Sequence, residues 1–184
     1  MELNFEEVVL PHLDAAYRLA RSLTGTEDDA EDAVQEAALR AFRYFRTFSG
    51  GNGRAWFLRI VRHICYDSHG EKLKAAADTF DEEKHTASRL TPEVLLLHED
   101  NVSLIEDAMS DLPERVRELL VLRELEGLSY REMADVLQIP IGSVMSGLSR
   151  ARQAFRLALA VELHRRERPA STRRFTCGPP VSVT

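Results

Sequence analysis

Apolar residues recur at steps of three and four along most of this chain, which is the period of an amphipathic α-helix. One such stripe runs from Phe5 to Leu23. A second, rich in alanine, runs from Ala30 to Phe45 and includes Phe42 on the face expected to be buried. Short alanine side chains allow neighbouring helices to approach closely. Because runs with the period of a β-strand are scarce, we expect an all-α fold.

Turn signals divide the chain into two small helical domains. A glycine-rich loop at 49–53 precedes a third helix over 54–74. Pro113 opens a later helix that Gly127 closes, with Leu125 expected to face inward. We therefore expect an N-terminal domain at 1–74, a flexible acidic linker at 75–95, a C-terminal domain at 96–164 and a disordered tail at 165–184.

The net charge of -6 is unevenly distributed. It is -5 over residues 1–53, +3 over 54–74, -8 over 75–111 and +4 over 112–184. Local patches, rather than the total charge, decide whether a phosphate backbone is attracted. Two basic segments on separate helical elements therefore allow a nucleic-acid partner in spite of the acidic total.

Several classes of protein are excluded by what the sequence lacks. No apolar run approaches the roughly 18 to 20 residues that span a bilayer, and the N-terminus lacks the features of a signal peptide, so we expect a cytoplasmic protein without membrane insertion. Cys65 and Cys177 are too few for a disulfide framework or a zinc site. No nucleophile–base pair, phosphate-binding glycine loop or metal-ligand spacing occurs, so we expect no enzyme activity, catalytic residue, cofactor or metal.

The stretch from Ser129 to Phe155 predicts a helix-turn-helix. Ser129 and Glu132 form a capping-box pattern at a helix start, and residues 138–140 interrupt the helix before a second one begins. A plain helical hairpin is the alternative. In a groove-binding arrangement the second helix meets base edges, and the start of the first contacts phosphate. The expected DNA-contacting residues are Tyr130 and Arg131 on the first helix and Ser143, Met145, Ser146, Ser149 and Arg150 on the second.

The helix predicted over 54–74 has two different faces. One carries ordinary core residues such as Phe57 and Ile64. The other alternates aromatic and basic side chains on a stripe expected to face solvent, which suits unstacked single-stranded nucleic acid, although packing at the edge of the core is the alternative for its aromatic members. This second face comprises Trp56, Arg59, His63 and Tyr66, with Arg62 beside them.

Four segments together resemble the extracytoplasmic-function (ECF) sigma factors, the compact two-domain initiation subunits of bacterial RNA polymerase. The segments occur in the order found in that family and span most of residues 10–160. They are DAEDAVQEAALRAF at 29–42, RAWFLRIVRHICYD at 54–67, LPERVRELLVLRELEGLSYREMA at 112–134 and IGSVMSGLSRAR at 141–152.

The resemblance implies a partner for each part of the chain. The loop at 48–53 and the helix at 54–67 are expected to capture and melt the -10 element of promoter DNA, and the helix-turn-helix to read the -35 element. The linker is expected to lead toward the RNA exit path, and an anti-sigma protein is an expected partner. Docking on core RNA polymerase is expected to use Asp32, Gln35, Glu36 and Leu39.

The chain departs from the family pattern at three places. His63 replaces a usual Asn, and residues 68–71 replace a commonly Arg-rich run. Met145 and Gly147 stand where basic residues are common in the second helix of the helix-turn-helix. Since Gly147 has no side chain to reach phosphate, we expect an unusual -35 preference or reduced affinity.

Two functions remain as alternatives at this point. One is a sigma factor that recruits core polymerase to promoters. The other is a sigma mimic that titrates an anti-sigma protein, or a stand-alone helix-turn-helix regulator. The acidic helix at 29–42 and the aromatic-basic helix at 54–67 favour the sigma factor, because an ordinary repressor needs neither.

Overall fold

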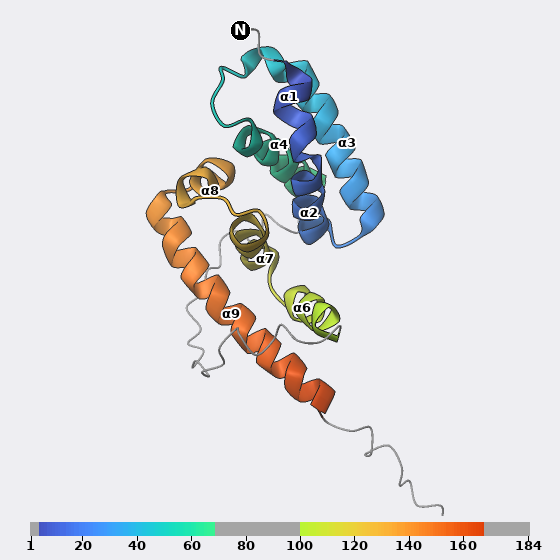
Figure 1. Cartoon of the computed structure of the whole chain (residues 1–184), viewed down its shortest axis with the longest axis vertical. Helices are drawn as coiled ribbons and strands as arrows, with labels where there is room; N and C mark the ends of the chain where they lie inside the picture. The colour runs from blue at the N-terminus through green and yellow to red at the C-terminus, as the bar shows by residue number, and fades with distance from the viewer. Residues whose placement is uncertain (1–3, 69–99, 168–184) are drawn as a thin grey trace, which may run out of the picture.

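The computed structural model describes residues 4–68 and 100–167. Within these ranges every regular element is a helix, which confirms the expected all-α fold (Figure 1). The linker predicted at 75–95 lies outside the described residues, as does the predicted tail beyond 167.

The N-terminal half begins as two helical segments where the sequence pattern predicted one. Pro11 lies in a short 3₁₀ turn between them, since its ring cannot continue an α-helix. Gly25 adopts a left-handed conformation with φ of 85° and ends the second segment, and Thr26 caps the next helix. The elements are α1 (Phe5–Val9), η1 (Leu10–His12), α2 (Leu13–Thr24), α3 (Glu27–Tyr44), η2 (Phe45–Thr47) and α4 (Gly53–Ser68).

The C-terminal half contains the predicted helix-turn-helix. Ser129 and Glu132 form the capping box at its start. Gln138, with a φ of 56°, reverses the chain before the second helix begins. The elements are α6 (Asp100–Ser110), α7 (Glu114–Leu120), a π-helical turn η4 (Val121–Leu125), α8 (Tyr130–Leu137) and α9 (Ile141–Glu167).

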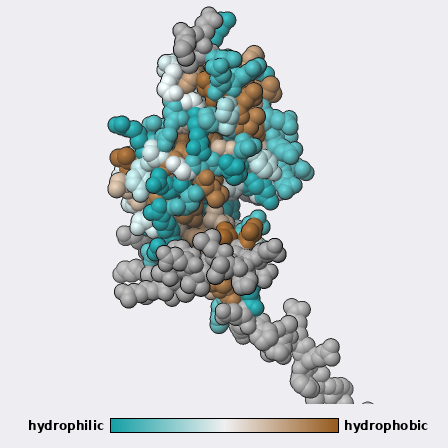
Figure 2. All heavy atoms as spheres, in the orientation of Figure 1, coloured by the Kyte–Doolittle hydropathy of each residue, from teal (hydrophilic) through white to brown (hydrophobic). Residues whose placement is uncertain are grey.

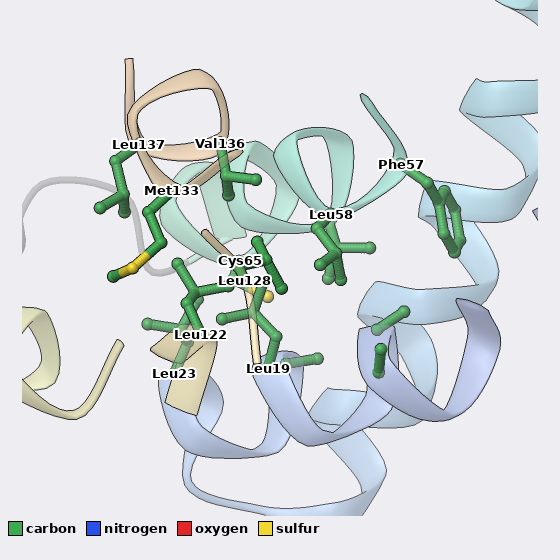
Figure 3. Close-up of a cluster of buried hydrophobic side chains, with 14 of the residues drawn as sticks. Leu19, Leu23, Phe57, Leu58, Cys65, Leu122, Leu128, Met133, Val136 and Leu137 are labelled. Carbon is green, nitrogen blue, oxygen red and sulfur yellow. The ribbon is translucent and has the colours of Figure 1, made fainter. Parts of the chain in front are cut away.

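The two halves share one hydrophobic core. The helix α4 packs against α8, and α2 packs against α7 and η4 (Figure 1). Figure 3 shows Leu19 and Leu58 of the N-terminal half beside Leu122 and Leu128 of the C-terminal half. Each of these four side chains is buried. In this structure the halves are therefore joined by apolar burial as well as by the chain.

Two large apolar residues are exposed where the sequence predicted them to be buried. Phe42 is 65% exposed on α3, where its ring meets the edge of Phe5 at a centroid distance of 5.3 Å. Only the alanine side of α3 faces its neighbours α2 and α4, so Phe42 lies beyond the covered face. Leu125 is also exposed, because the π-helical turn places more residues in each turn and rotates Leu125 out of the helical register.

The last helix also extends further than predicted. Helix α9 continues to Glu167, so residues 165–167 of the predicted tail are helical. The guanidinium of Arg166 donates to Asp107 of α6 at 2.6 Å and to Glu162 at 3.2 Å. The ion pair with Asp107 attaches the end of α9 to α6.

The structure places Gly147 on the buried side of α9. A β-carbon at this position would lie 3.2 Å from Cδ1 of Leu119 on α7. The absence of a side chain therefore serves the close packing of α7 on α9. Gly147 faces the core and not outward, so its missing side chain does not remove a phosphate contact. The expected unusual -35 preference or reduced affinity stays a prediction.

Replacing Gly147 by arginine tests this packing. We expect Gly147→Arg to lower the free energy of unfolding by about 1–3 kcal/mol, since a long side chain must displace Leu119. Urea unfolding followed by circular dichroism measures the change. The neighbouring exposed Ser146→Arg is the control and should stay within about 0.5 kcal/mol of the wild type. Equal stability of the two variants would contradict the assignment of Gly147 to the core.

Candidate nucleic-acid interfaces

The outward face of α9 carries the predicted duplex-reading residues. Met145 is 54% exposed, and the four other predicted residues of this helix are exposed as well. Their side chains offer three hydroxyls, one thioether and one guanidinium. The surface therefore offers short hydrogen-bonding groups and an apolar contact more than charge. The exposed residues are Ser143, Met145, Ser146, Ser149 and Arg150.

The first helix of the motif presents its predicted phosphate contacts differently. Arg131 is exposed at the start of α8. Tyr130 is half-buried, and the guanidinium of Arg123 lies over its ring, 5.0 Å from the centroid. Because Arg123 is fixed in this way beside Tyr130, it adds a positive charge next to the predicted pair. Arg123 was not among the residues predicted from the sequence.

The predicted single-strand face of α4 is mostly covered. Trp56 packs among aromatic rings, 5.0 Å from Phe48 and 6.2 Å from Phe45 between centroids. Arg59 is half-buried, and His63 alone of the predicted set is exposed. Partial burial and the neighbouring Arg62 lower the pKa of His63, so it is neutral at pH 7. The expectation that this stripe faces solvent is therefore corrected.

Arg62 and Tyr66 point toward a carboxylate of the other half of the chain. Arg62 Nε donates to Oε1 of Glu118 on α7 at 2.7 Å, and the Tyr66 hydroxyl donates to Oε2 at 3.0 Å. The guanidinium of Arg62 also lies 4.6 Å from the centre of the Tyr66 ring. Glu118 is only 2% exposed, and burial raises its pKa, although Arg62 opposes the shift.

A second buried carboxylate also joins the two halves. Arg18 Nε and Arg54 Nη2 each donate to the carboxylate of Glu126 at 2.6 Å. Burial would raise the pKa of Glu126, but the bonds to these two arginines outweigh it and lower the pKa. In the same interface the amide of Asn52 donates to Glu132 at 2.5 Å.

None of these contacts between the halves was predicted. The carboxylates and their partners are separated by 52 to 108 positions in the chain, so no local pattern relates them. One signal was available in the sequence. Glu118 directly precedes two core leucines on the helix after Pro113, where a charged residue is uncommon in a buried segment.

The outer face of α3 combines acidic and apolar side chains. Leu39 is 55% exposed, although it is a leucine, and three polar residues predicted to dock a partner are exposed around it. Glu36 pairs with Arg40 one turn away at 3.3 Å. Figure 2 shows hydrophobic residues beside hydrophilic ones on the surface of the half that α1 to α4 build. The three polar residues are Asp32, Gln35 and Glu36.

Residues 4–68 and 100–167 contain neither a membrane-spanning helix nor a cluster of metal ligands. No helix there is both long and apolar enough to cross a bilayer. No group of three or more His, Cys, Asp or Glu side chains in these ranges is arranged to hold a metal ion.

Comparisons with known proteins agree with this division of the chain. A family model described as Sigma-70 region 2 matches residues 8–75, and one described as Sigma-70, region 4 matches residues 103–155. The chain is 32% identical over 160 residues to the ECF RNA polymerase sigma factor SigE of Mycolicibacterium smegmatis, covering 85% of this chain and 62% of the relative. It is 30% identical over 165 residues to the RNA polymerase sigma-H factor of Pseudomonas aeruginosa, covering 84% of this chain and 86% of that one.

Solved structures show the same likeness. The sigma factor RpoE in complex with the anti-sigma factor NepR from Bartonella quintana matches with a TM-score of 0.66 and 26% identity, over 85% of this chain and 97% of that one. CnrH, in complex with the cytosolic domain of CnrY, matches with a TM-score of 0.57 and 24% identity over 88% of each chain, a likeness of fold.

A helix-turn-helix joined to a second helical half with an aromatic-basic helix is typical of DNA-binding proteins that act in transcription. The fold therefore indicates this class of protein. The matches to both sigma-70 regions and to the two relatives identify the family. The chain belongs to the ECF sigma factors of the sigma-70 family.

The pairing of Glu126 with two arginines predicts a dependence of stability on pH. A carboxylate whose pKa is lowered on folding stabilises the fold above its unfolded pKa of about 4.5, and loses this effect as the pH falls through the lower folded value. We expect Glu126→Gln to reduce the free energy of unfolding by about 1.5–3 kcal/mol at pH 7. The difference from the wild type should shrink when urea unfolding is repeated at pH 3.5.

The raised pKa of Glu118 changes stability with pH in the opposite direction. Because Glu118 is present in both the wild type and Glu126→Gln, its effect cancels in the difference between them. Glu124→Gln is the matched control, because Glu124 forms an exposed ion pair with Arg152 at 2.7 Å within the C-terminal half. If Glu126→Gln lost the same stability at both pH values, the two arginines would not lower the pKa of Glu126 on folding.

Proposed function

We propose that this chain is a cytoplasmic transcription initiation subunit, not an enzyme, that binds core RNA polymerase and directs it to promoters. One observation carries the proposal. A chain of the ECF family combines an exposed leucine in an acidic helix face with a helix-turn-helix whose second helix has an exposed start. A regulator that only binds an operator needs the second of these features alone.

The outer face of α3 is the proposed polymerase-docking surface. An exposed leucine among carboxylates suits a partner helix that offers an apolar groove and basic residues. Leu39 supplies the apolar contact, and the acidic residues supply orientation and faster association. The surface consists of Asp32, Gln35, Glu36 and Leu39.

Helix α4 is the proposed binding element for the melted -10 strand. Aromatic rings stack on unpaired bases, and guanidinium groups neutralise the backbone that connects them. Trp56 already has a neighbouring ring in Phe48, tilted by 39°, so a base placed on Trp56 would join an existing aromatic cluster. The proposed residues are Trp56, Arg59, Arg62, His63 and Tyr66.

The helix-turn-helix is the proposed reader of the -35 duplex. The exposed start of α9 matches the geometry in which a recognition helix meets base edges. Tyr130 and Arg131 lie where the preceding helix approaches the backbone. The side chains proposed to meet the bases are Ser143, Met145, Ser146, Ser149 and Arg150.

An anti-sigma protein is the proposed regulatory partner. Support comes from the family and from the structure of the Bartonella quintana sigma factor, which is described in complex with an anti-sigma factor. A sigma mimic or stand-alone regulator remains the competing function. Reconstitution with bacterial core polymerase separates the two, because a sigma factor co-elutes with core on size exclusion and gives transcripts from a promoter library, whereas a mimic does neither.

Removing the exposed leucine of α3 tests the docking surface. We expect Leu39→Asp to weaken binding to core polymerase at least about tenfold, since a carboxylate replaces the apolar contact at the centre of the interface. Fluorescence anisotropy of labelled protein titrated with core measures the affinity. The control is Leu10→Asp, which alters another leucine of similar exposure, 52%, on η1. Equal effects of the two substitutions would contradict the proposal.

A phosphate contact of the helix-turn-helix can be recognised by its salt dependence. We expect Arg131→Gln in the reconstituted holoenzyme to weaken binding to all promoter duplexes alike. The slope of log affinity against log salt should fall by about one, as expected for one lost phosphate contact. The control Arg156→Gln changes an exposed arginine two turns beyond Ser149 on α9. An unchanged slope in Arg131→Gln would remove Arg131 from the interface.

A further inference from the structure

Exposed apolar side chains gather where α9 begins, at the end of this helix that follows α8 (Figure 1). Ile139 is 38% exposed in the turn before the helix, Ile141 is 49% exposed at its first position, and Met145 is 54% exposed one turn later. Ile141 and Met145 are four residues apart, so they are neighbours on the same face of the helix. Neither side chain belongs to the buried core.

The charge of the surrounding segment indicates a nucleic acid as the partner of this apolar pair. From Ile139 to Val161 the sequence has three arginines and no carboxylate. One of them, Arg152, is paired with Glu124 of η4, and the segment stays positive without it. Such a segment attracts a phosphate backbone and offers no acidic group to a basic protein surface. The pair is also continuous with the exposed serines of α9 that are proposed to read the -35 duplex.

The major groove offers one apolar group for such a pair to contact. Among the edges of the four bases, only thymine carries a methyl group there, at C5, and apolar side chains contact it. Guanine, by contrast, is read best by the paired donors of a basic side chain. No basic residue precedes Arg150 on α9. The start of this helix is therefore better suited to thymine than to a run of guanines.

We infer that Ile141 and Met145 read the -35 element through the C5 methyl groups of thymine. The inference rests on the proposed reading of the -35 duplex by α9. It adds Ile141, which was not among the residues predicted from the sequence, as a residue that determines specificity. The transfer of one methyl group from water to an apolar contact corresponds to about fourfold in affinity.

Replacing thymine by deoxyuridine tests the contact, because it removes the methyl group and keeps the hydrogen-bonding groups of the base. The holoenzyme, reconstituted from the full chain and bacterial core polymerase, first selects promoter duplexes from a random library. Each thymine of the selected -35 element is then replaced in turn, on both strands, and the affinity is measured by fluorescence anisotropy. We expect at least one replacement to weaken binding about fourfold.

The same pair of duplexes is then measured with variants of the chain. We expect the ratio of the two affinities to fall to about one in Ile141→Ala or in Met145→Ala, depending on which side chain contacts that methyl group. Val161→Ala is the matched control and should keep the wild-type ratio, since Val161 is a 57% exposed apolar residue near the other end of α9. The ratio compares two duplexes on one protein, so partial misfolding of a variant does not alter it.

Several outcomes would overturn the inference. A selected -35 element without thymine is one, and a ratio of about one in the wild type is another. A ratio that both variants keep would also do so, because the methyl group would then act through the shape of the duplex. If the holoenzyme selects no duplex and gives no transcripts, the proposed function fails, and the inference fails with it. Selection of an element that lacks thymine leaves the function standing and removes the inference alone.

Discussion

The arrangement of the two halves depends on the burial of two carboxylates between them. A charged group inside a protein costs several kcal/mol unless it is paired and hydrogen-bonded. Glu118 meets this requirement only when Arg62 and Tyr66 lie against it, and Glu126 only when Arg18 and Arg54 do. The apolar contacts of the shared core could tolerate small shifts, but the ion pairs allow one register. They therefore select the relative position of the halves more than they add to stability.

Local features of the fold were predictable because they depend on nearby residues. The spacing of apolar residues predicted the helices, and the capping box at Ser129 predicted the start of the helix-turn-helix. The predictions that were wrong concern residues whose environment depends on neighbours distant in sequence or on an irregular turn. Leu125 is exposed because of a π-helical turn, which no single-sequence signal marks. Gly147 is buried because Leu119 occupies the space beside it, which the helix alone does not reveal.

The same distinction applies to the candidate sites. The apolar residues of α9 recur with the helical period and pack on the preceding helices. The residues of its exposed face could therefore be predicted from the sequence. The orientation of α4 could not, because Glu118 is 52 positions or more from the residues that it binds. A helix face of aromatic and basic side chains can be exposed to solvent, bind a nucleic-acid strand or pack against a buried carboxylate. Only the three-dimensional structure distinguishes these environments.

The length of α9 gives the helix-turn-helix a mechanical property. Its 27 residues form a rod of about 40 Å at 1.5 Å for each residue. The side chains proposed to face the bases lie near one end, and the other end is attached to α6 through Arg166. A rotation of about 10° about the α6 end would move the opposite end by about 7 Å, roughly two base pairs of a DNA duplex at 3.4 Å each. In the proposed complex, the contact of α6 with α9 therefore contributes to where along the duplex these side chains lie.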